Sequence, residues 1–512
     1  MASTVVASSP NAARPLRTLT VPPRRALALP ILCSAGLAAV ALYGPVRENA
    51  RLFWSILDSA AVLLGWTVVL FLAARRSGRR FTLELVPRPQ HYVQACAHIS
   101  IFIYWGWYWA PVYAYAHLIL AQLLFAYAFD VLLAWSRRKT YTLGFGPFPI
   151  ILSTNLFLWF KAEWFFLQLL MIAVGFAAKE FIRWHKDGRQ VHIFNPSSFS
   201  LTVFSLALLA TDTTNITWGQ DIAITQFYPP HMYLFLFLVA LPGQLLFGVT
   251  TMTMSAVVTT YLFGLAYFGL TGTYYFYDSY IPIAVFLGMH LLFTDPSTAP
   301  RTDLGRIIFG ALYGMSTIML YELLGRAGLP TFYDKLLQVP LLNLTIQRID
   351  RAVRSGWLGW LDPSAIGRTL APRRRYLAYV SLWAFVFAAI SAAQGVGDQH
   401  RGQWIPFWRQ ACAENRPRAC AYLAQFYSTL CDAGSAWSCT ALGILQRTGG
   451  GDPHAALQSP PVEELPILLR GSKGPITDRS PTLLYGRACA QGWSQFCDAA
   501  TAPRDKMSVG AP

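Results

Sequence analysis

Long apolar runs separated by short polar loops constrain this chain more than any other feature. Many of the runs approach or exceed the roughly 17–20 residues that cross the hydrocarbon of a bilayer. Of the 512 residues 54% are hydrophobic and only 13% are charged, about half the charged fraction of a soluble protein. The sequence therefore predicts an all-α fold, a polytopic bundle of transmembrane helices surrounded by membrane lipid.

About thirteen runs are candidate spans. They lie near residues 26–44, 54–74, 93–110, 115–135, 146–160, 163–182, 196–211, 231–247, 250–270, 281–294, 306–325, 331–345 and 376–394. The runs at 146–160 and 331–345 are short, so either could be re-entrant, which requires that its backbone be packed inside protein. We divide the chain into a basic leader (1–25), a two-span hairpin (26–90), a membrane core (91–350), a basic linker with the last span (351–395) and a tail (396–512).

Lysine and arginine are distributed unevenly between alternate loops. One set of loops, which includes the leader and the linker, carries 24 of them, and the other set carries 5. Basic loops stay in the cytoplasm, so we expect a bacterial inner-membrane protein with a cytoplasmic N-terminus and a periplasmic tail. The net charge of +16 then reflects orientation and not nucleic-acid binding. The first apolar run could instead be a cleaved signal peptide, and the acid-free leader also resembles an organellar transit sequence.

Six of the eight cysteines lie in the tail, in three pairs that each enclose seven residues. The pairs are Cys412 and Cys420, Cys431 and Cys439, and Cys489 and Cys497. Residues eight apart on one straight helix are about 12 Å apart along its axis, too far for a disulfide. Each pair should therefore bridge two helices across a turn, in an oxidising compartment.

The tail segments around these pairs are similar to one another. They read "ACAENRPRACAYLAQFY", "LCDAGSAWSCTALGIL" and "ACAQGWSQFCDAA". They resemble the cysteine-rich Sel1-like repeats of secreted bacterial proteins. The resemblance implies a small disulfide-stapled, α-solenoid-like tail that contacts other proteins. A small stapled domain without a partner is the alternative.

The apolar run 196–211 begins within a polar motif, Asn195-Pro196-Ser197-Ser198. Proline suits the first turn of a helix, and asparagine is a good N-cap whose side chain accepts from the exposed amides of that turn. The motif therefore predicts the capped start of a helix. Because free amides at a helix N-terminus attract anions, a phosphate or an isoalloxazine carbonyl could also bind here.

A second segment, "LLFTDPSTAPRTDLGRIIFG", repeats this chemistry at Thr294, Asp295, Ser297 and Thr298. Both motifs fall on the cytoplasmic side of the expected topology. Asp295 could alternatively do no more than cap its own loop. His290 lies five residues earlier, and with the intramembrane Gln244 it suggests a polar cavity near the motif, although a lone buried histidine is more often a packing group.

The two motifs, in this order and about 100 residues apart, resemble the RnfD/NqrB family of membrane subunits of ion-translocating electron-transport complexes. The resemblance covers roughly residues 90–350. Segments such as "HYVQACAHISIFIYWGWYW" and "PTFYDKLLQVPLLNLTIQRIDRAV" are similar to the RnfD-like proteins of enediyne biosynthesis clusters.

The resemblance implies flavin chemistry. In the family, FMN is esterified to a threonine of a Ser-Gly-Ala-Thr motif in the outer loop that follows the Asn-Pro span. Here that loop, residues 211–230, contains threonines but no such motif. Covalent FMN is therefore not expected, and FMN or riboflavin held noncovalently is the form that the resemblance leaves. The cofactor-binding candidates are Asn195, Pro196, Ser197, Ser198, His290, Thr294, Asp295, Ser297 and Thr298.

We expect a non-enzymatic subunit of a membrane electron-transport or redox assembly, with other membrane or periplasmic subunits as partners. The sequence indicates no catalytic residue and no metal-ligand set. Two alternatives stay open. One is a small-molecule transporter or export component, because broken helices with polar ends also form substrate sites. The other is a membrane anchor that presents the Sel1-like tail.

Overall fold

The computed structural model describes residues 16–186, 188–356, 359–363, 371–393, 400–448, 459–469 and 480–501. Within these ranges the chain is mainly helical, with one three-stranded and one two-stranded sheet, so the all-α prediction is confirmed in its coarse form. The first fifteen residues of the leader and parts of the linker (357–358 and 364–370) lie outside the described residues.

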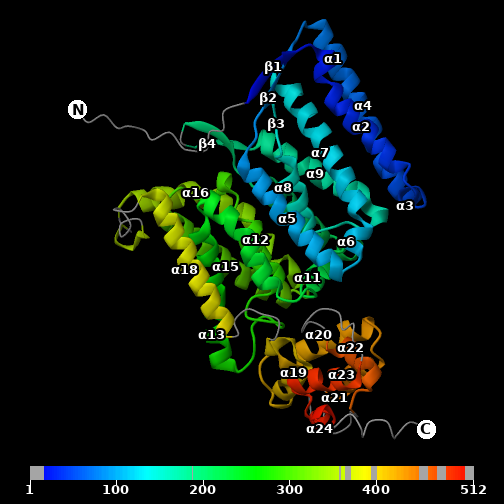
Figure 1. Ribbon diagram of the computed structural model, residues 1–512, viewed down its shortest axis with the longest axis vertical. Coiled ribbons are helices and arrows are strands. Elements are labelled where there is room, and N and C mark those ends of the chain that lie inside the picture. The colour runs from blue at the N-terminus through cyan, green and yellow to red at the C-terminus, as the bar shows by residue number, and fades with distance from the viewer. Residues whose placement is uncertain are drawn as a thin grey trace.

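Seven helical segments of the described residues are long and apolar enough to cross a membrane. They are Pro23–Ala41, Ala50–Arg76, Ala116–Arg137, Ala162–Phe181, Thr250–Thr271, Asp303–Arg326 and Arg374–Ala392. In the labels of Figure 1 they correspond to α1–α2, α4, α7, α9 with its first turn, α13, α15 and α18. Two shorter apolar helices, α10 (Pro196–Ala210) and α12 (Met232–Phe247), accompany them. Membrane helices are therefore supported, but the count of about thirteen spans is not confirmed.

Two of the expected spans are half-length helices. Helix α8 (Pro147–Asn155) and helix α14 (Ile283–Leu291) have nine residues each, about 13 Å at 1.5 Å per residue. That is about half of the hydrocarbon thickness. The run at 146–160 is thus the short element that the sequence allowed, whereas the run at 281–294 is not a full span. The run at 331–345 divides between a 3-10 turn, η4 (Thr331–Lys335), and helix α16 (Val339–Arg354).

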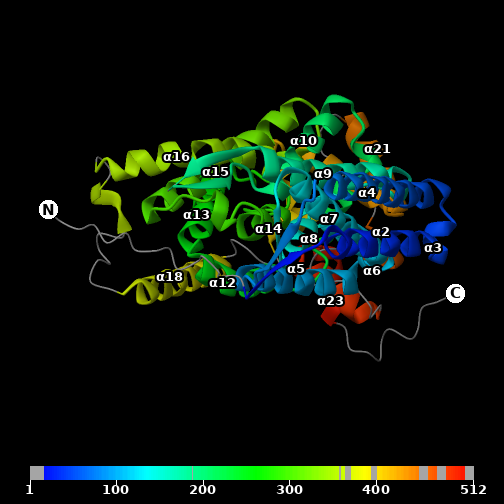
Figure 2. The same cartoon turned by 90° about the horizontal axis from the view of Figure 1, so that it is seen from above.

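The two half-length helices occupy equivalent places in two similar series of elements. In the first series α7 packs against α8 and α9 (Phe165–Phe181), and in the second α13 packs against α14 and α15. Helix α5 (Pro89–Tyr108) contacts α8 and α12, and α10 contacts α16, so the two series are joined. Figures 1 and 2 show these helices gathered in one bundle.

Each half-length helix ends on a side-chain carboxamide from a neighbouring element. Gln226 donates through Nε2 to the carbonyl of Leu156, the C-cap of α8, at 2.8 Å. Asn195 donates through Nδ2 to the carbonyl of Leu292, the C-cap of α14, at 2.9 Å. A carbonyl released by the end of a helix inside an apolar bundle has no water to accept from. The two carboxamides satisfy these carbonyls.

The strands and the tail lie at opposite ends of the bundle (Figure 1). Strand β2 (Phe81–Leu85) pairs with β1 (Arg17–Val21) antiparallel and with β3 (Thr140–Leu143) parallel. The end of the leader is therefore a strand of a sheet. A hairpin of β4 (Arg183–Lys186) and β5 (Arg189–His192) precedes α10. The arginine-rich segments 75–88, 137–139 and 183–189 adjoin or contain these strands.

The tail is a group of short helices joined by disulfides. Its helices are α19 (Ile405–Ala413), α20 (Ala419–Asp432), α21 (Ala436–Thr448), α22 (Leu465–Leu468), α23 (Pro481–Ala490) and α24 (Cys497–Thr501). Cys412 bonds to Cys420, Cys431 to Cys439, and Cys489 to Cys497. Each bond joins consecutive helices, so the predicted pairing across a turn is confirmed. A solenoid is not confirmed, and residues 449–458 and 470–479 lie outside the described part of the tail.

The tail docks on the bundle through polar contacts. Arg418 forms an ion pair with Glu322 of α15. Tyr422 donates its hydroxyl to the carbonyl of Tyr275 at 2.6 Å, and Arg416 Nη1 donates to the carbonyl of Gly272 at 2.8 Å. The tail therefore covers the loop that joins α13 to α14.

Thiol counting tests the tail. Two of the eight cysteines, Cys33 and Cys96, are free, so a maleimide reagent should modify two thiols in the denatured, unreduced protein. Reduction should expose all eight. Mass spectrometry gives both counts, and modification of any tail cysteine without reductant would contradict the pairing.

Candidate functional site

The Asn-Pro motif forms a complete cap at the start of α10. The side-chain oxygen of Asn195 accepts from the amides of Ser197 at 3.1 Å and Ser198 at 3.4 Å. The side-chain nitrogen of Asn195 is committed to Leu292, as described above. The predicted N-cap is confirmed, and the same residue also ties α10 to the end of α14.

The Asp-Pro motif lies beside it. Asp295 Oδ1 accepts from the amide of Ser297 at 2.9 Å, and His192 Nε2 lies 3.5 Å from Asp295 Oδ2. Asn343 of α16 bridges the two motifs, because its Oδ1 accepts from the Asn195 amide at 3.3 Å and its Nδ2 donates to the carbonyl of Thr298 at 3.3 Å. The structure thus brings together two motifs that are about 100 residues apart in the sequence.

This junction leaves little room for a ligand. The amides of Ser197 and Ser198 that could have bound an anion already donate to Asn195. His290 and Thr294 line a cavity with Gln244, but its volume is only about 10 Å³, room for about one water. A cavity with polar side chains is therefore present near the Asp-Pro motif, but it has room for only about one water molecule. An isoalloxazine ring does not fit in it.

Two side chains at this small cavity have buried polar atoms without a hydrogen-bond partner. Both polar atoms of Gln244 and the Nε2 atom of His290 are buried and make no hydrogen bond. His290 Nδ1 lies 2.7 Å from the carbonyl of Phe286 one turn earlier. Unsatisfied polar groups at membrane depth are costly and are often functional.

Substitution of Asn195 tests the junction. Asn195→Ala removes the cap and leaves the Leu292 carbonyl unsatisfied, so we expect a loss of about 1–3 kcal/mol in the free energy of unfolding. Asn195→Asp keeps an acceptor for the amides of Ser197 and Ser198 but loses the donor to Leu292. It should fall between the alanine variant and the parent in denaturant titrations. Equal stability of all three proteins would contradict a bridging role.

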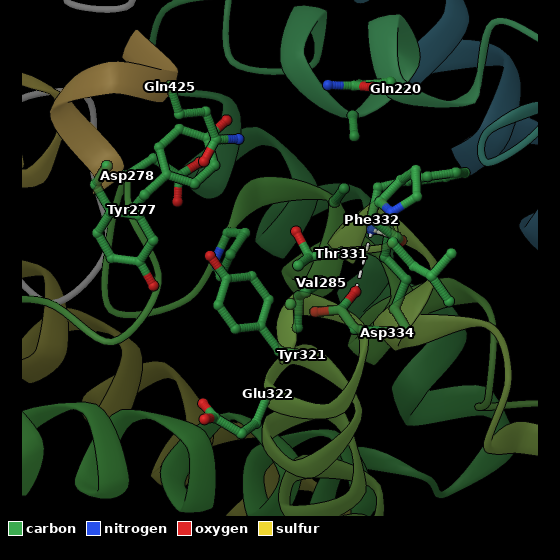
Figure 3. Close-up of a pocket in the computed structure, with 18 of the residues that line it drawn as sticks. Gln220, Tyr277, Asp278, Val285, Tyr321, Glu322, Thr331, Phe332, Asp334 and Gln425 are labelled. Carbon is green, nitrogen blue, oxygen red and sulfur yellow. Dashed lines mark hydrogen bonds and ion pairs between the residues drawn. The ribbon is translucent and has the colours of Figure 1, made fainter. Parts of the chain in front are cut away.

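A larger cavity lies at the other end of the bundle, between the membrane core and the tail. We call it the outer chamber. It has a volume of about 630 Å³ and is walled by α11 (Gly219–Thr225), the loop before α14, the end of α15, η4 and α20. Figure 3 shows Tyr277 and Asp278 on one side of it, Phe332 and Asp334 on the other, and Tyr321 between them.

The charged side chains in the interior of the outer chamber differ from those near its opening. Asp278 on one side of the chamber and Asp334 with Lys335 on the other are 8%, 2% and 3% exposed, and we call these three buried charged residues the floor of the chamber. Lys335 Nζ lies 3.3 Å from Asp334 Oδ1. Near the mouth, Glu322 is shared by two arginines, with 2.7 Å to Arg326 Nε and a second ion pair to Arg418 of the tail. The side chain of Arg326 is 78% exposed.

Burial alters the titration of the floor. It raises the pKa of Asp278 to about 7, because the hydrogen bond from Ser279 does not offset the loss of solvent. Burial also raises the pKa of Asp334 to about 6, against the lowering effect of Lys335. Buried carboxyl groups with raised pKa values in a cavity mark a functional-site candidate.

Sequence reasoning missed the outer chamber. Its residues come from four separated segments of the sequence, and none of these segments contains a recognisable motif. The available signal was the clustering of tyrosine with acid in "YDSY" and "FYDK", next to spans on the side where basic residues are rare. The nine predicted cofactor-binding residues do not line the chamber.

Comparison of the chain with protein-family models, with curated proteins and with solved structures found no match. Among the described residues, no group of three or more His, Cys, Asp or Glu side chains is placed to hold a metal ion. The chemistry of the chamber has to be argued from its own residues.

The raised pKa of Asp278 predicts pH-dependent stability. In the unfolded chain this carboxyl should titrate near its ordinary pKa of about 3.9. Because its pKa in the folded protein is higher, the free energy of unfolding should fall as pH rises from about 4 to about 7. Asp278→Asn does not titrate and should therefore raise the thermal midpoint more at about pH 8 than at about pH 5. The same shift at both pH values would contradict the assignment.

Proposed function

We propose that this protein is a multi-pass membrane subunit of RnfD/NqrB type that works in an electron-transport or redox assembly and holds a flavin noncovalently in the outer chamber. The observation that carries the proposal is the chamber itself. Its volume of about 630 Å³ is within the range of about 300–1,000 Å³ of small-molecule sites. One of its walls, α11, belongs to loop 211–230, the loop to which the resemblance assigns the cofactor.

The residues of the chamber fit a flavin better than those of the Asn-Pro junction do. Tyr321 and Phe332 offer aromatic faces to a planar ring. Gln220 and Gln425 bring carboxamides that both donate and accept. When bound, a flavin would supply electron transfer in one or two steps. The protein would bind the ring, orient it and limit its contact with water.

The proposed attachment is noncovalent. The residues of α11 that line the chamber are Gln220, Ala223 and Ile224, and none of them has a hydroxyl group for an ester. Thr225 is buried elsewhere and accepts from Trp105 Nε1 at 3.1 Å. This arrangement supports the expectation from the missing Ser-Gly-Ala-Thr motif.

An absorbance spectrum of the detergent-purified protein tests the proposal. We expect the visible absorption of an oxidised flavin, bleached by dithionite and restored by air. Denaturation with acid should release the chromophore into the soluble fraction, whereas an esterified flavin would stay with the protein. A purified protein that contains no flavin, and that binds none when riboflavin or FMN is added, would contradict the proposal.

The proposed orientation places the strands in the cytoplasm and the tail in the periplasm of a bacterial inner membrane, where the tail can contact other subunits of the assembly. Three arginine-rich segments, 75–88, 137–139 and 183–189, adjoin or contain the strands, which lie at the end opposite the tail, and this position supports the orientation. The three disulfides of the tail also support it, because they need an oxidising compartment.

Protease added to intact spheroplasts tests this orientation. It should cleave the tail and leave the N-terminal strand region intact, as read with antibodies against each end. Lysed spheroplasts, in which both ends are accessible, are the control. Protection of the tail in intact spheroplasts would contradict its proposed position in the periplasm.

One observation favours a second function, the transport or export of a small molecule. Helix α14 reaches from the outer chamber, where Ala284 and Val285 line the wall, to the small polar cavity at His290. In secondary transporters, discontinuous helices that end inside the membrane form the substrate site. Uptake of a labelled substrate into proteoliposomes by a flavin-free protein would favour this second function.

A further inference from the structure

We infer that the outer chamber orients an amphipathic ligand from end to end: Asp278 accepts an N–H donor of the ligand's buried polar edge, and Arg326 and Arg418 bind an anionic group at the mouth. The inference rests on the proposed function, because a flavin with a terminal phosphate has this distribution of groups. It goes further by assigning the residues at each end and by making the tail part of the binding site.

The floor of the chamber presents an acceptor. Asp278 is 8% exposed and lines the cavity. The ion pairs of the described residues give cations to Asp334 and Glu322 but none to Asp278. Ser279 Oγ donates to Asp278 Oδ1 at 3.3 Å, but a carboxylate has more acceptor sites than one donor fills, and its burial without an ion pair is costly. An N–H group of a ligand, neutral or cationic, would supply a second donor.

The mouth of the chamber presents an excess of positive charge. Arg326 and Arg418 share the single carboxylate of Glu322, so this group of three side chains has a net charge of about +1. Each guanidinium has five N–H donors, and the contacts with Glu322 leave several of them available. Guanidinium groups bind phosphate through paired hydrogen bonds.

The tail supplies one of these two arginines. Arg418 precedes α20 and lies over the ring of Tyr275 at 5.0 Å. Tyr422, one turn further along, is held by its hydrogen bond to the Tyr275 carbonyl and also lines the chamber. The docked tail is therefore a wall of the site as well as a neighbour of the membrane core.

Two matched flavin pairs test the two ends separately, with the full-length protein in nanodiscs and flavin fluorescence as the binding signal. FMN and riboflavin differ only in the phosphate. Riboflavin and 3-methylriboflavin differ only in the ring N–H. We expect FMN to bind about tenfold tighter than riboflavin, because hydrogen bonds between guanidinium groups and a phosphate are charge-assisted and solvent near the mouth weakens them. We expect 3-methylriboflavin to bind several-fold more weakly than riboflavin.

Variants assign each difference to its residue. Arg326→Gln should reduce the preference for FMN and leave riboflavin binding within about twofold, and Arg418→Gln should do the same if the tail remains docked. Asp278→Ala should weaken FMN and riboflavin by a common factor and abolish the discrimination against 3-methylriboflavin. Arg47→Gln makes the same charge change outside the chamber and should alter none of these ratios.

The outcomes separate the inference from the proposed function. If the parent protein binds none of the flavins, the proposed function fails, and the inference fails with it. If flavins bind but FMN has no advantage, or its advantage survives Arg326→Gln and Arg418→Gln, the assignment of the mouth is overturned while flavin binding stands. If Asp278→Ala leaves the 3-methyl discrimination intact, the assignment of the floor is overturned. Thiol counting and gel filtration show that each variant retains its disulfides and its fold.

Discussion

The need to satisfy backbone hydrogen bonds away from water is the constraint on which the membrane core depends. A full-length helix meets it internally, but α8 and α14 stop halfway and release carbonyl groups into the bundle. Gln226 meets the carbonyl of Leu156 and Asn195 meets that of Leu292. Gln168 extends the same solution, because its Oε1 accepts from the amide of Phe160 in the non-helical segment after α8. Irregular backbone persists inside this bundle because carboxamide side chains complete it.

These half-length helices also determine where space is left. Asn195 donates a hydrogen bond to the carbonyl at the end of α14, and only a water-sized cavity remains beside His290. The beginning of α14 instead borders the outer chamber, and the tail closes that chamber through the ion pair between Arg418 and Glu322. A site between two parts of one chain can combine a buried carboxyl floor, supplied by the core, with an exposed cationic mouth, supplied partly by the tail.

Local chemistry was predictable wherever the partner is close in the sequence. The Asn195 cap bonds to amides two and three residues away, and each disulfide joins cysteines eight residues apart. The prediction failed where the length of an apolar run was the only evidence for the conformation of its backbone. The run at 281–294 is apolar enough to suggest a span, yet only nine of its residues are helical. High hydropathy indicates that a segment is shielded from water. It does not show whether protein or lipid shields the segment, because both kinds of segment have the same composition.

The sequence by itself determined that the chain forms apolar helices and that its tail cysteines pair, because each of these follows from composition or from the spacing of a few residues. Only the tertiary structure decided which motif has space beside it. The amides of the Asn-Pro motif were predicted to bind an anion, but they already donate to the side chain of Asn195. Asp278, Glu322 and Arg418 belong to no motif, yet they line a chamber. The physical reason is that a cavity is a property of how distant segments pack, and no local pattern of residues encodes the volume left between them.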